Sequence, residues 1–261
     1  MNKSVGVEKK NSTFEFGWNL NKTHRPITTI LKQDGFVYFI RFSFRRFFLG
    51  PLIVITHSVF YRHFTIDNIK YRYQKTKLFE YDSMGERVIE IPYVRSLYAQ
   101  ITPNKVLEVG NVTRKWFHIQ NRTIVDKYEV ANLVINADIE KFQTDEKFDM
   151  IISISTIEHI GFDEVEKNDK KPLNSILNIL SFLNKTGLLI TTVPLGYNPN
   201  IDEIITKKMI DYDKIIFMKR YSILNLWRQC SYEEAISLKY GSKYEFANAV
   251  AFIIVSYRHS M

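Results

Sequence analysis

Cysteine is almost absent from this sequence: Cys230 is the only one among 261 residues. An internal disulfide and a zinc site built from several cysteines are therefore excluded, and no metal site is expected. Because the chain needs no oxidising environment, we expect it in a reducing compartment, the cytoplasm.

Long hydrophobic segments are also lacking. The most apolar run, residues 47–61, is shorter than the roughly 20 residues that a membrane-spanning helix needs, and Gly50 and Pro51 interrupt it. The opening residues are polar and contain no apolar core of a secretory signal. We therefore expect neither a spanning helix nor a secretory signal.

The remaining composition is that of an ordinary globular protein, with 45% hydrophobic and 25% charged residues and a formal net charge of +8. Residues 1–100 carry 16 Lys and Arg against 8 Asp and Glu, whereas residues 101–261 carry 20 of each. This asymmetry predicts a basic, aromatic-rich N-terminal region at 1–99 and a second domain at 100–261.

The N-terminal region contains one clear pattern. Residues 36–48 alternate aromatic side chains with Arg41, Arg45 and Arg46, which share one side of a helix. Three interpretations stay open: a helix packed by its aromatic face, a helix on a membrane surface, or a surface for phosphate or nucleic acid. Nucleic acid is the least favoured because no RNA-binding signature is present. Residues 1–34 and 67–82 are predicted to be irregular, and residues 86–100 helical.

The second region has the regular pattern of alternating strands and helices. Short apolar runs predict strands at 106–109, 123–126, 133–135, 148–154, 188–193 and 249–256. Helical spacing predicts a helix at 173–183, which residues 184–187 should end before the fifth strand. This order is typical of an α/β fold with a doubly wound, mostly parallel sheet.

Ligands of such sheets bind at the carboxyl ends of the strands. Glu108 and Gly110 close the first strand, Asp126 the second and Asp138 the third. A glycine there lets the backbone approach a ligand closely, and an acid at the end of the second strand is placed to bind a ribose diol. Each residue also has a structural interpretation, as a turn glycine or as an aspartate that caps a helix or turn.

These strand ends belong to a longer series of motifs, which runs over about residues 80–260: Arg-Val-Ile-Glu-Ile-Pro (87–92), Leu-Glu-Val-Gly-Asn-Val (107–112), Val-Asp-Lys-Tyr-Glu (125–129), Ser-Ile-Ser-Thr-Ile-Glu-His-Ile-Gly (153–161) and Val-Pro-Leu-Gly-Tyr-Asn-Pro (193–199). In order and spacing they resemble class I S-adenosylmethionine-dependent methyltransferases with a Rossmann-like fold, in particular a poorly characterised subgroup with a degenerate glycine motif.

The resemblance implies S-adenosylmethionine as cofactor and assigns roles along the strand ends. The implied cofactor-binding residues are Glu108, Gly110 and Asn111 at the methionine and ribose end, Asp126 at the ribose hydroxyls, Asp138 and Ile139 at the adenine, and Ser155 near the acceptor. His159 and Glu158 are the catalytic candidates, with His159 as a general base because its pKa normally lies near neutrality. Tyr197 and Asn198 are further candidates for acceptor contact.

One departure from the family pattern leaves two functions open. Val112 and Arg114 replace the second and third glycines of the usual first motif. The first hypothesis is methyl transfer to a small-molecule or glycan-type acceptor. The second is a catalytically inactive module that binds an anionic ligand, a membrane surface or nucleic acid through Arg41, Arg45 and Arg46. Under either hypothesis we expect a cytoplasmic protein, with peripheral membrane attachment as an open alternative.

Overall fold

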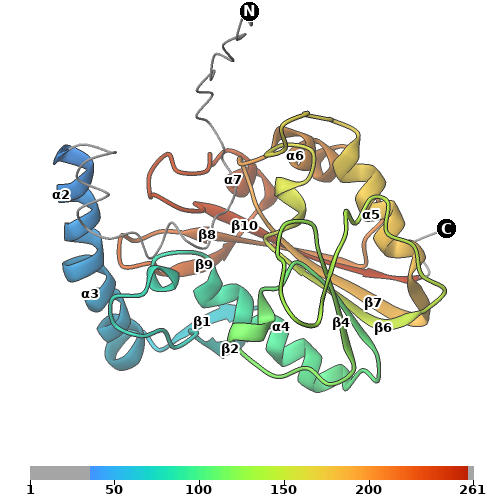
Figure 1. Cartoon of the computed structure of the whole chain (residues 1–261). Helices are drawn as coiled ribbons and strands as arrows, with labels where there is room; N and C mark the ends of the chain where they lie inside the picture. The colour runs from blue at the N-terminus through green and yellow to red at the C-terminus, as the bar shows by residue number, and fades with distance from the viewer. Residues whose placement is uncertain (1–35, 258–261) are drawn as a thin grey trace, which may run out of the picture.

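The computed structural model describes residues 36–257, without the side chains of residues 36–39. The irregular start expected at residues 1–34 lies outside the described residues. An eight-stranded sheet runs through the molecule in the order β5-β4-β3-β6-β7-β10-β8-β9 (Figure 1). Its strands are β3 (Val106–Val109), β4 (Arg122–Asp126), β5 (Val134–Asn136), β6 (Phe148–Ile154), β7 (Leu183–Pro194), β8 (Lys214–Arg220), β9 (Trp227–Cys230) and β10 (Ala249–Ser256).

The sheet is parallel from β5 to β7 and mixed beyond it. Strand β10 is antiparallel to both β7 and β8, and β9 is antiparallel to β8. The predicted doubly wound, mostly parallel sheet is therefore confirmed, and each of the six predicted strands is present.

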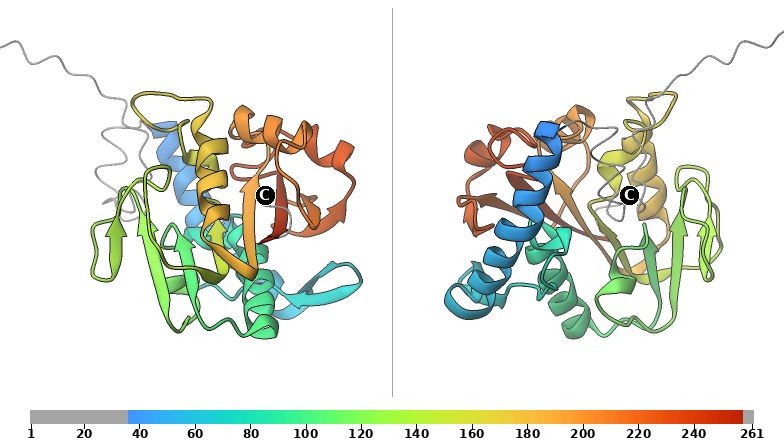
Figure 2. Two further views of the ribbon diagram at one scale, coloured as in Figure 1. Left: turned by 90° about the vertical axis from the view of Figure 1, so that its right-hand side faces the viewer. Right: turned by 60° about the vertical axis from the view of Figure 1, so that its left-hand side comes forward.

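Helices cover both faces of this sheet (Figures 1 and 2). Helix α4 (Arg87–Ile101) lies on one face, and α5 (Lys171–Ser181), α6 (Pro199–Thr206) and α7 (Tyr232–Ile236) lie on the other. Strand β6 shows why its sequence is continuously apolar: Ile152 packs on the α4 side, whereas Ile151 packs on the α5 side.

A long helical segment precedes the sheet and stands at one side of the molecule (Figure 1). It comprises α2 (Phe36–Phe44), η2 (Arg45–Leu49), α3 (Gly50–Ile55) and η3 (Thr56–Phe60), two α-helical stretches that alternate with π-helical turns. The helix predicted at 36–48 is confirmed and continues to residue 60. Within residues 36–257, no helix is both long and apolar enough to cross a bilayer.

A β-hairpin follows this segment, where a loop at residues 67–82 was predicted. Strands β1 (His63–Ile66) and β2 (Ile69–Arg72) pair antiparallel, so the prediction was wrong for residues 69–72. Phe64 and Tyr71 lie in a hydrophobic cluster with side chains of β8, β9 and β10, and this packing stabilises strands too short to show a clear period.

The structure also bears on the predicted helix end at residues 184–187 and on the predicted boundary between the two regions. Residues 184–187 do not separate a helix from a strand, because they belong to β7, which begins at Leu183 and pairs with Phe148. The expected boundary between residues 99 and 100 falls inside α4. Since Ile91 and Val94 pack against strands β3, β6 and β7, residues on both sides of that position share one core.

Candidate functional site

The predicted site residues lie on loops that meet at the carboxyl edge of the sheet. The loop after β3 touches the loop after β6, and Asn111 Nδ2 donates to Glu129 Oε1 of the loop after β4 at 2.7 Å. Tyr197, after β7, donates its hydroxyl to Asp163, after β6, at 2.6 Å. These contacts thus bring together the loops that follow four strands, β3, β4, β6 and β7.

Gly110 occupies a turn that requires glycine. Its φ of +83° lies in the left-handed region, and a Cβ there would stand 2.5 Å from Thr156 Oγ1. The structural interpretation of this glycine is therefore sufficient to explain it, and a role toward a ligand stays a prediction.

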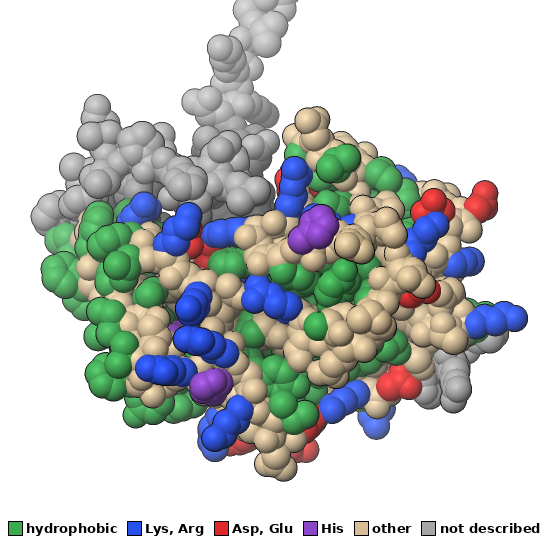
Figure 3. Space-filling model, turned by 90° about the horizontal axis from the view of Figure 1, so that it is seen from below, with side chains coloured by type: hydrophobic (Ala, Val, Ile, Leu, Met, Phe, Trp, Pro, Cys, Tyr) green, Lys and Arg blue, Asp and Glu red, His purple; other side chains and the backbone are tan. Residues whose placement is uncertain are grey.

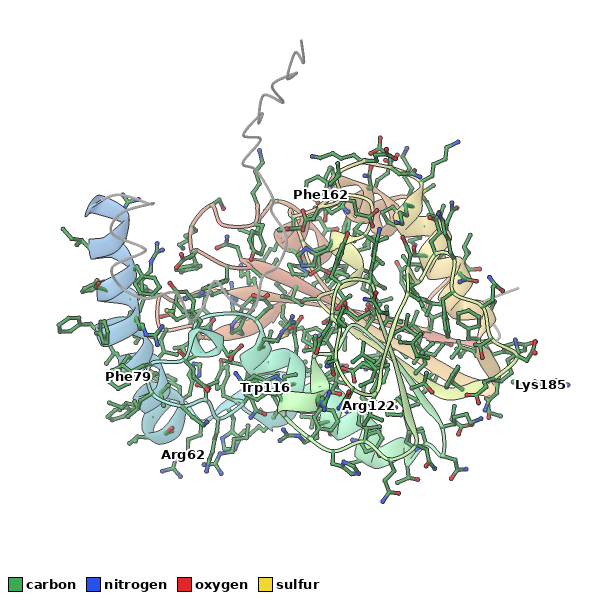
Figure 4. All side chains as sticks on the ribbon, viewed as in Figure 1. Arg62, Phe79, Trp116, Arg122, Phe162 and Lys185 are labelled. Carbon is green, nitrogen blue, oxygen red and sulfur yellow. The ribbon has the colours of Figure 1, made fainter. Side chains whose placement is uncertain are left out.

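Glu108 is buried beneath this turn and holds the loop that follows it. Its Oε1 accepts from the Thr113 backbone N–H at 2.6 Å, while Oε2 accepts from the Thr113 hydroxyl at 2.7 Å and from Arg122 at 2.9 Å. Burial raises the pKa of Glu108, although Thr113 and Arg122 act in the opposite direction. Both carboxylate oxygens are thus used within the protein, and Figure 4 shows Arg122 beside the loop.

The two side chains that replace motif glycines are engaged away from this turn. Val112 packs against the cluster of α4 and β3, and Arg114 donates to the carbonyl oxygen of Asn132 at 3.2 Å. Asn111 contributes an unusual feature, because its buried Oδ1 has no hydrogen-bond partner among the described residues. The loop therefore presents one buried acceptor that a ligand donor can satisfy.

Asp126 ends β4 with one oxygen occupied and one available. Its Oδ1 accepts from the backbone N–H groups of Tyr128 and Glu129, both at 2.8 Å. Among residues 36–257, Oδ2 has no hydrogen-bond partner, and the residue is half-buried. The first contacts fix the carboxylate, and the second oxygen can accept hydroxyl donors.

Asp138 lies in a cluster of four charges. Lys127 pairs with Asp138 and Glu164 at 2.9 Å each, and the buried Lys171 pairs with the same two acids. Burial alone raises the pKa of Asp138, but Lys171 and Lys127 outweigh it and hold the pKa below its ordinary value. Ile139 is 4% exposed and belongs to the hydrophobic core.

Ser155 follows β6 in a strained conformation, with φ of +38°. Its hydroxyl donates to Glu90 Oε1 at 2.6 Å, and Arg87 pairs with the other oxygen of Glu90. This serine therefore links the end of β6 to the start of α4.

Two further glutamates are buried beside Arg87 and Glu90, and the hydrogen bonding of their carboxyl groups is incomplete. Glu158 and Glu86 are 1% and 4% exposed, and the Oε2 atom of each has no hydrogen-bond partner among the described residues. Burial, together with Glu90 and Glu86, raises the pKa of Glu158 well above its ordinary value despite Arg87. Burial and Glu90 likewise raise the pKa of Glu86. A cation bound beside these two side chains would satisfy their unpartnered oxygens and would lower both pKa values again.

His159 is oriented by a carboxylate and an aromatic ring. Its Nδ1 contacts Asp163 Oδ2, its Nε2 lies 3.6 Å from Glu158 Oε1, and its ring packs edge-on against Tyr197 at 5.0 Å. Burial alone raises the pKa of Asp163, but hydrogen bonds from His159 and Tyr197 hold it below its ordinary value. A carboxylate on one ring nitrogen is the arrangement that prepares the other as a proton acceptor.

Comparison with known proteins found no matching family model and no matching curated protein. Among solved structures, the chain is similar to an N-methyltransferase from Bradyrhizobium japonicum in complex with S-adenosyl-L-homocysteine (14% identity, 65% of this chain and 89% of that chain, TM-score 0.40). It is also similar to an S-adenosylmethionine-dependent methyltransferase from Clostridium acetobutylicum (11% identity, 63% of this chain and 89% of that chain, TM-score 0.35). A sugar N-methyltransferase from Streptoalloteichus matches over 49% of this chain and 53% of its own (13%, TM-score 0.33).

The arrangement of the strands agrees with the doubly wound, mostly parallel sheet that the sequence predicts. Five parallel strands, β5 to β7, are followed by β10, which is inserted antiparallel before β8, and helices cover both faces. The chain has a Rossmann-like α/β fold, as the resemblance of its motifs led us to expect. Within this fold, Asp126 is the last residue of β4, and Ser155, Glu158 and His159 follow the carboxyl end of β6, as the motifs predicted.

Several residues of this site were not predicted from the sequence: Glu86, Arg87, Glu90, Asp163, Glu164 and Lys171. One signal for them was available, because Glu90 interrupts the apolar residues Ile89 and Ile91 on a predicted helix. A charged residue in such a stretch is buried only with partners. The partners of Glu90 are distant in sequence, as its contact with Ser155 shows.

Proposed function

We propose that this chain transfers a methyl group from S-adenosylmethionine to a small-molecule or glycan-type acceptor. The observation that carries the proposal is the pair of buried carboxylate oxygens, on Glu86 and Glu158, that lack partners at the carboxyl edge. A buried polar atom without a partner costs about 1–3 kcal/mol, and more if charged. A ligand with a positive charge at this end and a diol near Asp126 would satisfy both places.

The residues at this edge fit the ribose and the cationic end of the proposed cofactor. The adenine end fits only after a side chain has moved. Asp126 Oδ2 would accept from the ribose hydroxyls, and Glu86 and Glu158 would face the cationic end. At the adenine end, Asp138 already pairs with Lys127 and Lys171, so adenine binding there requires a rearrangement of Lys127, the more exposed of the two lysines.

The bound cofactor would supply an activated methyl group on a sulfonium. The protein's part would then be alignment of the acceptor and removal of its proton. His159 would take that proton at Nε2, while Asp163 holds Nδ1 and stabilises the charged ring. Such a base is needed only for acceptors that are protonated at neutral pH.

Aromatic side chains beside His159 support a ring-shaped polar acceptor. The Tyr197 ring lies 5.7 Å from Phe162 and 5.0 Å from Tyr240, both edge-on. Figure 4 shows Phe162 at the end of the molecule where the loop after β6 lies. Aromatic rings with hydroxyl groups offer an apolar surface and a hydrogen-bonding edge together.

Isothermal titration with S-adenosylmethionine and S-adenosylhomocysteine tests the proposal. We expect measurable binding, and Asp126→Ala should weaken it by about 1–3 kcal/mol because the ribose hydroxyls lose an acceptor in the closed site. Asp145→Ala, which removes an exposed acid with no hydrogen bond from its side chain among the described residues, is the matched control and should bind as the wild type does. Absence of heat with both compounds at millimolar concentration would refute the proposal.

A further inference from the structure

The long helix of residues 36–60 attaches to the protein by one narrow face. Phe42, Gly50, Ile53 and His57 are buried on that face. Phe42 packs on Tyr81, and the His57 ring nitrogen Nε2 lies 3.1 Å from the carbonyl oxygen of Asn225. Figure 2 shows the helix running along the side of the domain. These contacts fix its orientation and determine which side chains face outward.

The outward face is a continuous apolar stripe at helical spacing. Its members are exposed by 44–73% of their surface: Ile40, Phe44, Phe47, Phe48, Leu52, Ile55, Val59 and Phe60. A soluble helix normally carries polar residues on the side away from the core. Here both sides are apolar, so the outward side requires a partner of its own.

A neighbouring loop enlarges the same apolar surface. Phe79 is 45% exposed, and its ring lies 5.9 Å from that of Phe47. Figure 4 shows Phe79 beside the helix. Leu78 is 51% exposed. Phe79 also has a φ of +68°, a conformation that is costly for a bulky residue. The fold thus holds two large apolar side chains outward at this position.

Basic side chains border this surface at the foot of the helix. Arg62 lies two residues after the last residue of the helix, Phe60. The hairpin places Arg72 opposite His63 and Lys70 opposite Thr65, and all of these side chains are exposed. Between residues 36 and 80 the chain has 8 Lys and Arg against 2 Asp and Glu. Viewed from below, hydrophobic side chains gather at one margin of the molecule with a group of Lys and Arg beside them (Figure 3).

We propose that this face docks on an anionic lipid surface, with the helix lying in the plane of the interface. Charge complementarity selects the partner, because exposed phenylalanines bordered by cations match the acyl and headgroup layers of an anionic membrane. Most of the cations that border this face lie at the foot of the helix. On the helix itself, Arg41 is exposed, whereas Arg45 pairs with Glu245. The inference goes beyond the proposed function and does not depend on the cofactor.

The first test removes the apolar contact. The full chain is sedimented with phosphatidylcholine vesicles that contain about one-third phosphatidylserine. Phe44→Ser/Phe48→Ser/Leu52→Ser should lower the partition coefficient by at least about tenfold. The matched control, Val165→Ser/Leu177→Ser/Met209→Ser, removes three exposed apolar side chains elsewhere and should bind as the wild type does. Thermal unfolding of each variant shows that the fold is retained.

The second test removes the charges and leaves the apolar stripe. Each cation near an anionic surface contributes a factor of roughly five, so Arg62→Gln/Lys70→Gln/Arg72→Gln should lose about 100-fold in binding at low salt. The control Lys141→Gln/Lys185→Gln/Lys208→Gln has the same net charge but alters sites away from this face; Figure 4 shows Lys185 at the opposite end of the molecule from Arg62. Wild-type binding should weaken as salt rises.

Three outcomes would overturn the inference. The first is wild-type protein that stays in the supernatant with anionic vesicles at low salt. The second is a loss of binding that is equally large in each triple variant and in its matched control, which would indicate nonspecific adsorption. The third is a stable dimer, seen by light scattering without lipid, that only the Phe44/Phe48/Leu52 variant dissociates; the face would then be an interface between two copies.

Discussion

Substitution of Gly110 by alanine tests whether the turn after β3 has the shape described. Left-handed backbone costs a residue with a Cβ roughly 1–2 kcal/mol. The new Cβ would also stand 2.5 Å from Thr156 Oγ1, closer than such atoms approach. Forcing the two loops apart costs about 1–3 kcal/mol, as overpacking does elsewhere. We therefore expect Gly110→Ala to lower the free energy of unfolding by about 2–5 kcal/mol.

A double-mutant cycle separates the two costs. Thr156→Ala removes the two nearest atoms and leaves only its Cβ, 3.3 Å from the introduced one. The pair Gly110→Ala/Thr156→Ala should thus recover the steric cost, a coupling of about 1–3 kcal/mol, and retain the conformational cost. Urea unfolding of the four proteins measures both quantities.

Gly85→Ala is the matched control for this cycle. A Cβ at Gly85 would meet its nearest atom, in the Phe246 ring, at 3.9 Å, an ordinary contact, and its φ is not in the left-handed region. The change in stability should stay within about 0.5 kcal/mol. If Gly110→Ala were as mild as Gly85→Ala, the turn and its contact with Thr156 would be wrong, and with them the approach of the two strand-end loops.

Two further predictions concern the buried acids and the histidine. Because burial raises the pKa of Glu158, the folded chain keeps a proton that the unfolded chain releases, and stability falls as pH rises above the ordinary glutamate value. Glu158→Gln should flatten this fall in urea midpoints measured across that range, and an unchanged slope would contradict the assigned burial. His159→Ala should lower methyl transfer to hydroxylated and aminated sugars about 100-fold while cofactor affinity holds; a parallel loss of folding stability would mark His159 as structural.

The sequence was sufficient for the parallel strands and for the residues at their carboxyl ends. Strand β6 was predictable because a strand buried on both faces needs an uninterrupted apolar run. Asp126 and His159 were predictable as neighbours of the site because parallel strands all end at one edge of the sheet. The hairpin of β1 and β2 was not, since its four-residue strands depend on Phe64 and Tyr71 packing against distant strands.

Only the tertiary structure decided the electrostatics of the site and the surface of the long helix. Ser155 and Glu90 are separated by 65 positions, and no local pattern shows that the fold joins them. Residues 36–60 carry apolar side chains on the exposed face as well as on the buried one, so their periodicity could not separate the two faces. That choice depends on which side chains meet Tyr81 and Asn225, contacts between segments that only the folded chain brings together.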